Sequence, residues 1–172
     1  EARMKASSKE YDEAIAIYNS ILKAEPGNVD ALNGKARVLA WMGKHEDARS
    51  VYQKVLSKHP SNVESLTGMA DTYAWQKKFD MGIELLENSL SVNQDNRDIL
   101  IRLARYHLWK GEKDESLYYS NRILSSHPAD SDALDTRSKA SFLYTLEYYA
   151  GHYYLDINNN VDGNNAYAGF RY

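Results

Sequence analysis

From Leu32 to Pro60 the chain reads LNGKARVLAWMGKHEDARSVYQKVLSKHP, and the rest of the sequence repeats the pattern of this stretch. Its apolar residues return along the chain at a constant interval of 34 residues. All three tryptophans of the chain, Trp41, Trp75 and Trp109, have this spacing. A period of this length with helical spacing inside it is typical of stacked helix pairs.

Each repeat contains two predicted amphipathic helices. Leu32, Ala36 and Leu39 have i, i+4, i+7 spacing, which predicts the buried face of the first helix. Gly43 is expected to end this helix in a left-handed turn. Pro60 is expected to end the second helix because proline lacks the N–H donor. The apolar stripe of the second helix consists of Ala48, Val51, Tyr52, Val55 and Leu56.

Helix starts are also marked in the sequence. An asparagine or aspartate that can cap the first turn occurs once per repeat, and an acidic residue follows two positions later, where the helix dipole favours an anion. These pairs are Asn28 with Asp30, Asn62 with Glu64, Asn96 with Asp98, and Asp130 with Asp132.

The pattern resembles the tetratricopeptide repeat over residues 1–143. The residues that carry the match are Leu32, Ala36, Gly43, Ala48, Tyr52, Leu56 and Pro60, with Leu100, Ala104, Gly111, Leu124 and Pro128. The resemblance implies an all-α, right-handed helix-turn-helix solenoid with a partial first repeat, three full repeats and a capping helix near Ser131–Leu143. The sequence departs from the pattern at four positions. Lys77 replaces the turn glycine and Gln94 replaces the proline, and in the second helix of the last full repeat Ser116 and Ser120 stand at the positions of Ala48 and Tyr52.

Composition excludes several classes of protein. The net charge of −3 does not favour a nucleic-acid partner, and the absence of cysteine excludes disulfides, thiolate metal sites and a cysteine nucleophile. The five histidines form no pair with metal-ligand spacing, and no glycine-rich phosphate loop is present. We therefore predict a protein that is not an enzyme and that has no cofactor and no metal.

A second stripe on the first helix of each repeat contains the candidate binding residues. The resemblance implies that this stripe lines a concave groove that holds a protein or peptide partner. An indole offers a flat apolar face to a sugar ring or a peptide side chain, but packing between repeats is the simpler interpretation of periodic tryptophans. The candidate residues are Trp41, Trp75, Trp109, Asn33, Arg37, Asp71 and Arg105.

Residues 144–172 form a second predicted segment, in which half of the 14 tyrosines of the chain occur. Apolar and polar residues alternate with period two on both sides of the turn cluster Asn158–Asn165, which contains Asp-Gly, so a strand-turn-strand is expected. Alternating aromatic segments of this kind are typical of outer-membrane barrel strands. We therefore predict a β-hairpin-like, strand-turn-strand tail; the resemblance described next implies that this tail is the first hairpin of a barrel whose remaining strands lie beyond residue 172.

The phrase LAW-x-G at Leu39–Gly43, with weaker copies at Tyr73–Trp75 and Tyr106–Gly111, is similar to repeats that precede a YaiO-type outer-membrane β-barrel. This second resemblance implies a location in the periplasm or outer membrane; a cytoplasmic location is the alternative. Three functions follow as hypotheses: a scaffold for protein–protein interaction, as the periplasmic arm of an outer-membrane assembly or export protein; a module that guides polysaccharide to the barrel; and a structural repeat that assembles with itself.

Overall fold

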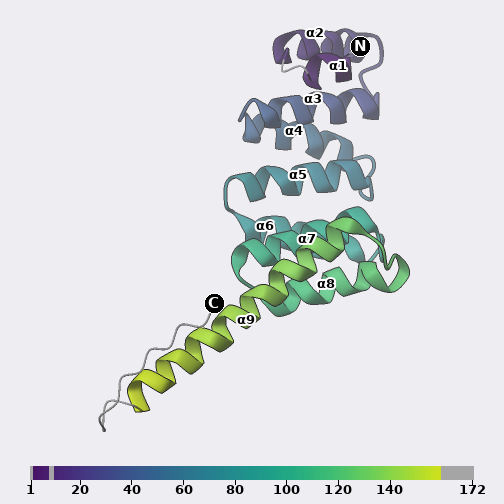
Figure 1. Ribbon diagram of the computed structural model, residues 1–172. Coiled ribbons are helices and arrows are strands. Elements are labelled where there is room, and N and C mark those ends of the chain that lie inside the picture. Colours follow the sequence, from purple (N-terminus) through teal and green to yellow (C-terminus); the bar gives the residue numbers. More distant parts are fainter. Residues whose placement is uncertain (1, 8–9, 160–172) are drawn as a thin grey trace.

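The computed structural model describes residues 2–7 and 10–159, and this part of the chain contains nine α-helices and no strand. Figure 1 shows the helices stacked in chain order, with α1 and α2 at one end of the stack and α8 and α9 at the other. The predicted helical solenoid is therefore confirmed for the described residues. The helices are α1 (Ala2–Ser7), α2 (Tyr11–Ala24), α3 (Val29–Trp41), α4 (His45–Leu56), α5 (Val63–Trp75), α6 (Phe79–Leu90), α7 (Arg97–Lys110), α8 (Lys113–Ser126) and α9 (Ser131–Asn159).

The predicted helix caps are confirmed. The side-chain oxygen of Asn28 accepts a hydrogen bond from the Ala31 backbone N–H at 2.9 Å, and Asn62 makes the equivalent bond to α5. Asn96 caps α7 and Asp130 caps α9 in the same way. Each cap satisfies an N–H donor that the first turn of a helix leaves free. The start of α3, α5, α7 and α9, the first helix of each repeat after α1, is therefore specified by the local sequence.

The turns inside the helix pairs contain left-handed residues. Gly43 and Gly111 have φ of 77° and 87°, as glycine permits without strain. Lys77 occupies the same position one repeat before Gly111 and also has positive φ, at 59°. The turn geometry is thus kept even where the glycine is absent.

Small residues allow the helices to approach closely. The predicted pattern residues Ala36, Ala48 and Ala104 are fully buried, and so is Ala70, which lies one period after Ala36. A repeat of two helices has too little apolar surface to form a core alone, so each pair buries its faces against its neighbours. The core consequently runs along the stack from α1 to α9.

The strand predicted over residues 144–154 is wrong, because the backbone is helical through Asn159. Helix α9 contains no proline and only one glycine, Gly151, so the helix that starts after Asp130 meets no strong breaker. Adding a residue to an existing helix requires no new nucleus, whereas a lone hairpin is marginal in water. The predicted second strand, over residues 166–172, lies outside the described residues.

Helix α9 also crosses the predicted domain boundary at residue 143, and the division into two domains stays a prediction. Among the described residues, none of the helices combines the length and the hydropathy needed to cross a membrane.

Candidate functional site

A pocket of about 240 Å³ lies between α3 and α5, and we call it the α3–α5 pocket. Four of the predicted binding residues, two tryptophans and two charged residues, come together in its wall. The lining residues are Arg37, Ala40, Trp41, Tyr52, Glu64, Gly68, Asp71, Trp75 and Arg102. Both Trp41 and Trp75 are the last residues of their helices, so the indoles stand at the same end of α3 and α5.

The three indoles are about half exposed, with exposed fractions of 44% for Trp41, 50% for Trp75 and 55% for Trp109. Each indole packs against the ring of the residue that begins the second helix of the preceding repeat. The distances between ring centroids are 6.4 Å for Trp41 and Tyr11, 6.0 Å for Trp75 and His45, and 6.1 Å for Trp109 and Phe79. The indoles therefore link successive repeats and still present surface to solvent.

The charged groups of the α3–α5 pocket are paired with one another. Arg37 of α3 forms an ion pair with Glu64 of α5. Asp71 of α5 accepts hydrogen bonds from Arg102 of α7, whose Nε lies 3.1 Å from both carboxylate oxygens. Asp71 also accepts a hydrogen bond from the Tyr106 hydroxyl. These contacts connect three successive first helices along one face of the stack.

Burial raises the pKa of Tyr106 well above its usual value, and the neighbouring Asp71 carboxylate adds to this rise. Burial also raises the pKa of Tyr52. Both phenols therefore remain protonated at neutral pH. Tyr106 acts as a hydrogen-bond donor to Asp71, which fixes the orientation of that carboxylate.

Arg105 and Trp109 do not line the α3–α5 pocket. Arg105 instead donates to Asp132 of α9 at 2.6 Å. Arg97 donates to Asp130 at 2.8 Å and also pairs with Asp132. The Arg97 guanidinium and the Ala133 backbone N–H hold the pKa of Asp130 at about 2, and Arg97 also lowers the pKa of Asp132. This cluster joins α7 to the start of α9.

Asn33 is buried, with 1% of its surface exposed, so it is not at the surface of the groove as predicted. Its amide nitrogen donates to Asn62 Oδ1 at 3.2 Å, and its oxygen accepts from the Ser65 hydroxyl at 2.6 Å. Asn33 therefore ties α3 to the capped start of α5. The equivalent residues Thr67 and Ile101 are also buried, and the isoleucine was the sequence signal that this position faces the interior.

Arg102 is the pocket residue that the sequence analysis missed. It occupies the position held by Gly34 and Gly68 in the two preceding repeats. Its partner Asp71 occupies the position held by Arg37 and Arg105. The two departures from the repeat carry opposite charges, and their pairing is the signal that could have identified both residues.

The α3–α5 pocket thus offers two indole faces beside two ion pairs, an arrangement suited to binding a chain with both apolar and polar groups. Throughout residues 2–7 and 10–159, no group of three or more histidine and acidic side chains is placed to hold a metal ion.

Residues 6–60 match the family model of the tetratricopeptide repeat. The chain is similar in structure to MamA, with a TM-score of 0.67 over 96% of this chain and 94% of that protein, at 19% sequence identity. This is a tetratricopeptide-repeat fold. The predicted tetratricopeptide resemblance is confirmed at the level of the fold.

Two further tetratricopeptide-repeat structures resemble the chain. One is a thermophilic protein of this class from Thermus thermophilus, with a TM-score of 0.71 over 82% of this chain and 78% of that one, at 20% identity. The other is the first tetratricopeptide-repeat domain of Spaghetti (RPAP3) bound to the HSP90 peptide SRMEEVD, with a TM-score of 0.61 over 66% and 90%, at 21% identity. A comparison with curated proteins gives no match.

Proposed function

We propose that this tetratricopeptide-repeat chain is a non-enzymatic scaffold that binds a peptide segment of a partner protein at the α3–α5 pocket. The observation that carries the proposal is the pair of half-exposed indoles, Trp41 and Trp75, at the edge of one pocket. A tryptophan with only a core role would be covered by other side chains. A surface without a binding role rarely has large aromatic residues at equivalent positions of successive repeats. The Spaghetti domain provides an example of this fold with a bound peptide.

The charges of the pocket indicate what kind of peptide fits. Arg37 is paired with Glu64, and Arg102 is paired with Asp71, so a charged ligand group has to displace an existing ion pair. An aromatic or aliphatic side chain has no such requirement and gains by covering the indole faces. A volume of about 240 Å³ accommodates one large side chain. The expected ligand is therefore an extended peptide with an apolar anchor residue between Trp41 and Trp75.

A selection from a library of random decapeptides displayed on phage tests this function. The full chain should enrich peptides with an aromatic or aliphatic anchor, and Trp75→Ala should bind them at least tenfold more weakly, since truncation of an anchor contact costs about 1.4 kcal/mol or more. Trp109→Ala is the matched control, because it removes an indole of similar exposure outside the pocket. Selected peptides that bind wild type and Trp75→Ala equally contradict the proposal.

Glycan binding is the second candidate function, and the exposed indole faces favour it, since sugar rings also stack on tryptophan. The same variants distinguish the two candidates on an array of bacterial polysaccharides. Retention of a polysaccharide that depends on Trp41 and Trp75, without enrichment of peptides, supports the glycan hypothesis. The charged groups of the pocket are already paired, so neither a peptide nor a glycan would bind mainly through charge. The affinity for either ligand is therefore expected to depend only weakly on salt concentration.

We also propose that the scaffold acts in the periplasm, as an arm of an outer-membrane assembly or export protein. The support is the similarity of Leu39–Gly43 and its copies to repeats that precede outer-membrane barrels. Residues 144–159 no longer contribute to this argument, because they are helical. The open reading frame that contains this sequence tests the location: a signal peptide upstream and a barrel downstream support it, and a frame without both contradicts it.

A further inference from the structure

The outer face of α9 lacks the cover that the equivalent faces of the other repeats have. In α3, Ala36 and Ala40 are buried in a cluster with Ala48, Val51 and Tyr52 of α4, and Leu32 packs against this cluster. The equivalent residues of α9, three periods later, are Leu134, Ser138 and Phe142. Ser138 is exposed, and the exposed fractions of Leu134 and Phe142 are 36% and 60%.

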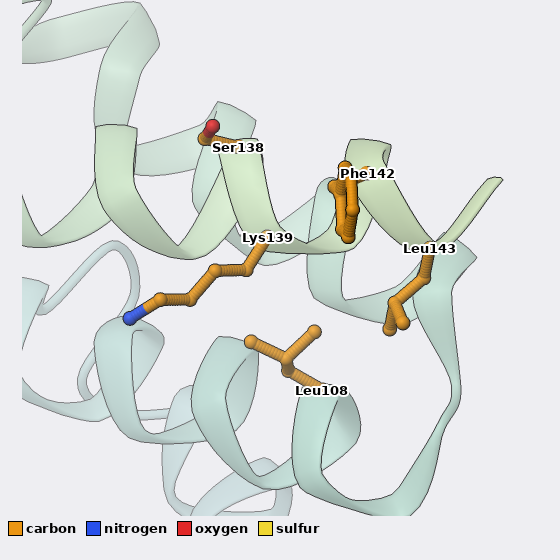
Figure 2. A pocket seen from close by; sticks show the side chains of 5 residues that line it. All are labelled: Leu108, Ser138, Lys139, Phe142 and Leu143. Atoms are coloured by element: carbon orange, nitrogen blue, oxygen red, sulfur yellow. The ribbon is translucent and has the colours of Figure 1, made fainter. Parts of the chain in front are cut away.

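A pocket of about 470 Å³ adjoins this face. Figure 2 shows Phe142 and Leu143 of α9 on one side of the pocket and Leu108 of α7 on the other, with the stem of Lys139 along the edge. The apolar side chains around this space indicate that it is built to receive another apolar group. In repeat proteins the terminal unit normally has a polar outer face. Exposed apolar residues on the outer face of the last helix therefore indicate an interaction surface.

We propose that a second copy of this chain covers the face, with the α9 helices of the two copies packed antiparallel. Leu134, Ser138 and Phe142 form a large–small–large stripe that is complementary to itself under twofold rotation. With Ser138 on the axis, Leu134 of each copy lies opposite Phe142 of the other. The small serine allows the helices to approach closely, as Ala36 and Ala48 do inside the repeat. Such an interface is isologous, the common type in homodimers.

The charges of α9 fit this arrangement. The stretch Ser131–Leu143 contains two acidic and two basic residues, so two copies bring no net charge together. Asp135 and Lys139 are paired at 2.6 Å within the helix, and Asp132 is paired with arginines of α7.

Single-cysteine cross-linking of the full chain tests the proposal directly, because the natural sequence contains no cysteine. Ser138→Cys should form a disulfide-linked dimer under mild oxidation, since a residue on a twofold axis faces its own copy. Ser57→Cys, at an exposed serine after α4, is the matched control and should remain monomeric. Equal cross-linking of both variants overturns the proposal.

Sedimentation velocity over about a hundredfold range of protein concentration gives a second readout, because a dimer dissociates on dilution by mass action. Wild type should be dimeric at the upper end, and Phe142→Glu should raise the dissociation constant at least tenfold with an unchanged circular dichroism spectrum. Val92→Glu places the same charge on another exposed apolar residue and should leave the dimer intact. A wild-type chain that is monomeric at every concentration, or a dimer that survives Phe142→Glu, overturns the second copy as occupant, whatever other segment or protein covers α9.

Discussion

The phenol ring of Tyr52 lies directly over Gly68, so that a Cβ atom at Gly68 would stand 2.4 Å from both Cζ and Oη of the ring. Tyr18 and Gly34 have the same relationship one repeat earlier, again with 2.4 Å to Cζ. The second helix of each of these repeats thus places a tyrosine where the first helix of the next repeat has no side chain. At these positions the tyrosine ring of one repeat packs against the backbone of the next repeat. Only glycine allows so close a contact, because it has no Cβ atom.

Gly68→Ala should therefore destabilise the chain. Alanine improves helix propensity by about 1 kcal/mol over glycine, but overpacking a buried contact costs about 1–3 kcal/mol. Tyr52 is only 3% exposed, so its ring has little space to move and the second effect should win. Urea denaturation should show a net loss of up to about 2 kcal/mol. Gly27→Ala is the control, because a Cβ there meets nothing within 4 Å; a stabilised Gly68→Ala would mean that the ring yields.

The pairing of Arg102 at the α3–α5 pocket should depend on Asp71. Asp71→Asn removes the charge that Arg102 and the buried Tyr106 hydroxyl both use, and hydrogen bonds to a charged group contribute about 1.5–3 kcal/mol. A double-mutant cycle with Arg102→Met, followed by urea denaturation, isolates the pairwise contribution. We expect a coupling of about 0.5–1 kcal/mol, because both side chains are partly exposed and solvent screens them. Strictly additive losses would show that the ion pair does not stabilise the fold.

The features that sequence analysis predicted correctly are those specified by neighbouring residues. Caps such as Asn62 and left-handed turns such as Gly43 depend on a few consecutive positions, and their repetition at a constant interval removes ambiguity. The helical part of the fold followed from these signals. The same kind of reasoning also placed Arg37, Trp41, Asp71 and Trp75 on one stripe, and they do line one pocket.

The errors concern positions that depend on neighbours in space. Asn33 is on the predicted stripe, but it is buried and accepts a hydrogen bond from the Ser65 hydroxyl of α5 instead of facing solvent. Arg102 of α7 stands where the preceding repeats have a glycine. Its role follows only from its pairing with the carboxylate of Asp71, on α5 of the preceding repeat. Residues 144–154 alternate with period two, yet no partner strand exists among the described residues, so the preceding helix continues. In each case, packing between elements decides the outcome.

Lys77→Gly should stabilise the chain. Lys77 holds a left-handed conformation with φ of 59°, which costs about 1–2 kcal/mol for a residue with a Cβ atom, whereas glycine at a turn loses roughly 0.5–1 kcal/mol through greater freedom in the unfolded state. Thermal denaturation should show a net gain of about 0.5–1 kcal/mol. The reciprocal variant Gly111→Lys should lose about 0.5–1 kcal/mol at the equivalent turn, because the same two effects act in reverse. A stability loss in Lys77→Gly would indicate that the lysine side chain makes a contact worth more than the strain.

The Asp130 cluster should make the chain sensitive to acid. The pKa of Asp130 is about 2 in the folded chain and 3.8 ordinarily, so its ionised form stabilises the fold above about pH 4, and this contribution is lost as the pH falls to about 2. Asp130→Asn keeps a capping oxygen, as Asn28, Asn62 and Asn96 show, but cannot pair with Arg97. The variant should be about 1–2 kcal/mol less stable than wild type at neutral pH, with the difference vanishing near pH 2. Urea titrations along this range provide the measurement; a constant difference would assign the effect to the cap.

Trp75→Ala separates a packing role from a binding role for the indoles. Trp75 is 50% exposed and packs against the ring of His45, so its truncation should cost about 1–2 kcal/mol, less than the 3–5 kcal/mol of a fully buried aromatic. Trp109→Ala should cost at least as much, because Trp109 contacts both Phe79 and Tyr106. Melting curves and binding isotherms with one selected peptide should be recorded for both variants.

If the indoles act as ligand surface, affinity and stability should be uncoupled in these two variants. Trp75→Ala should lose peptide affinity while remaining cooperatively folded, and Trp109→Ala should lose stability while keeping affinity at the α3–α5 pocket. A loss of about 3–5 kcal/mol in Trp75→Ala with unchanged affinity would instead assign the indole to the core and leave the pocket without its binding surface. The half-exposed state of Trp75 favours the first outcome, because an exposed indole face contributes little to folding and remains available to a ligand.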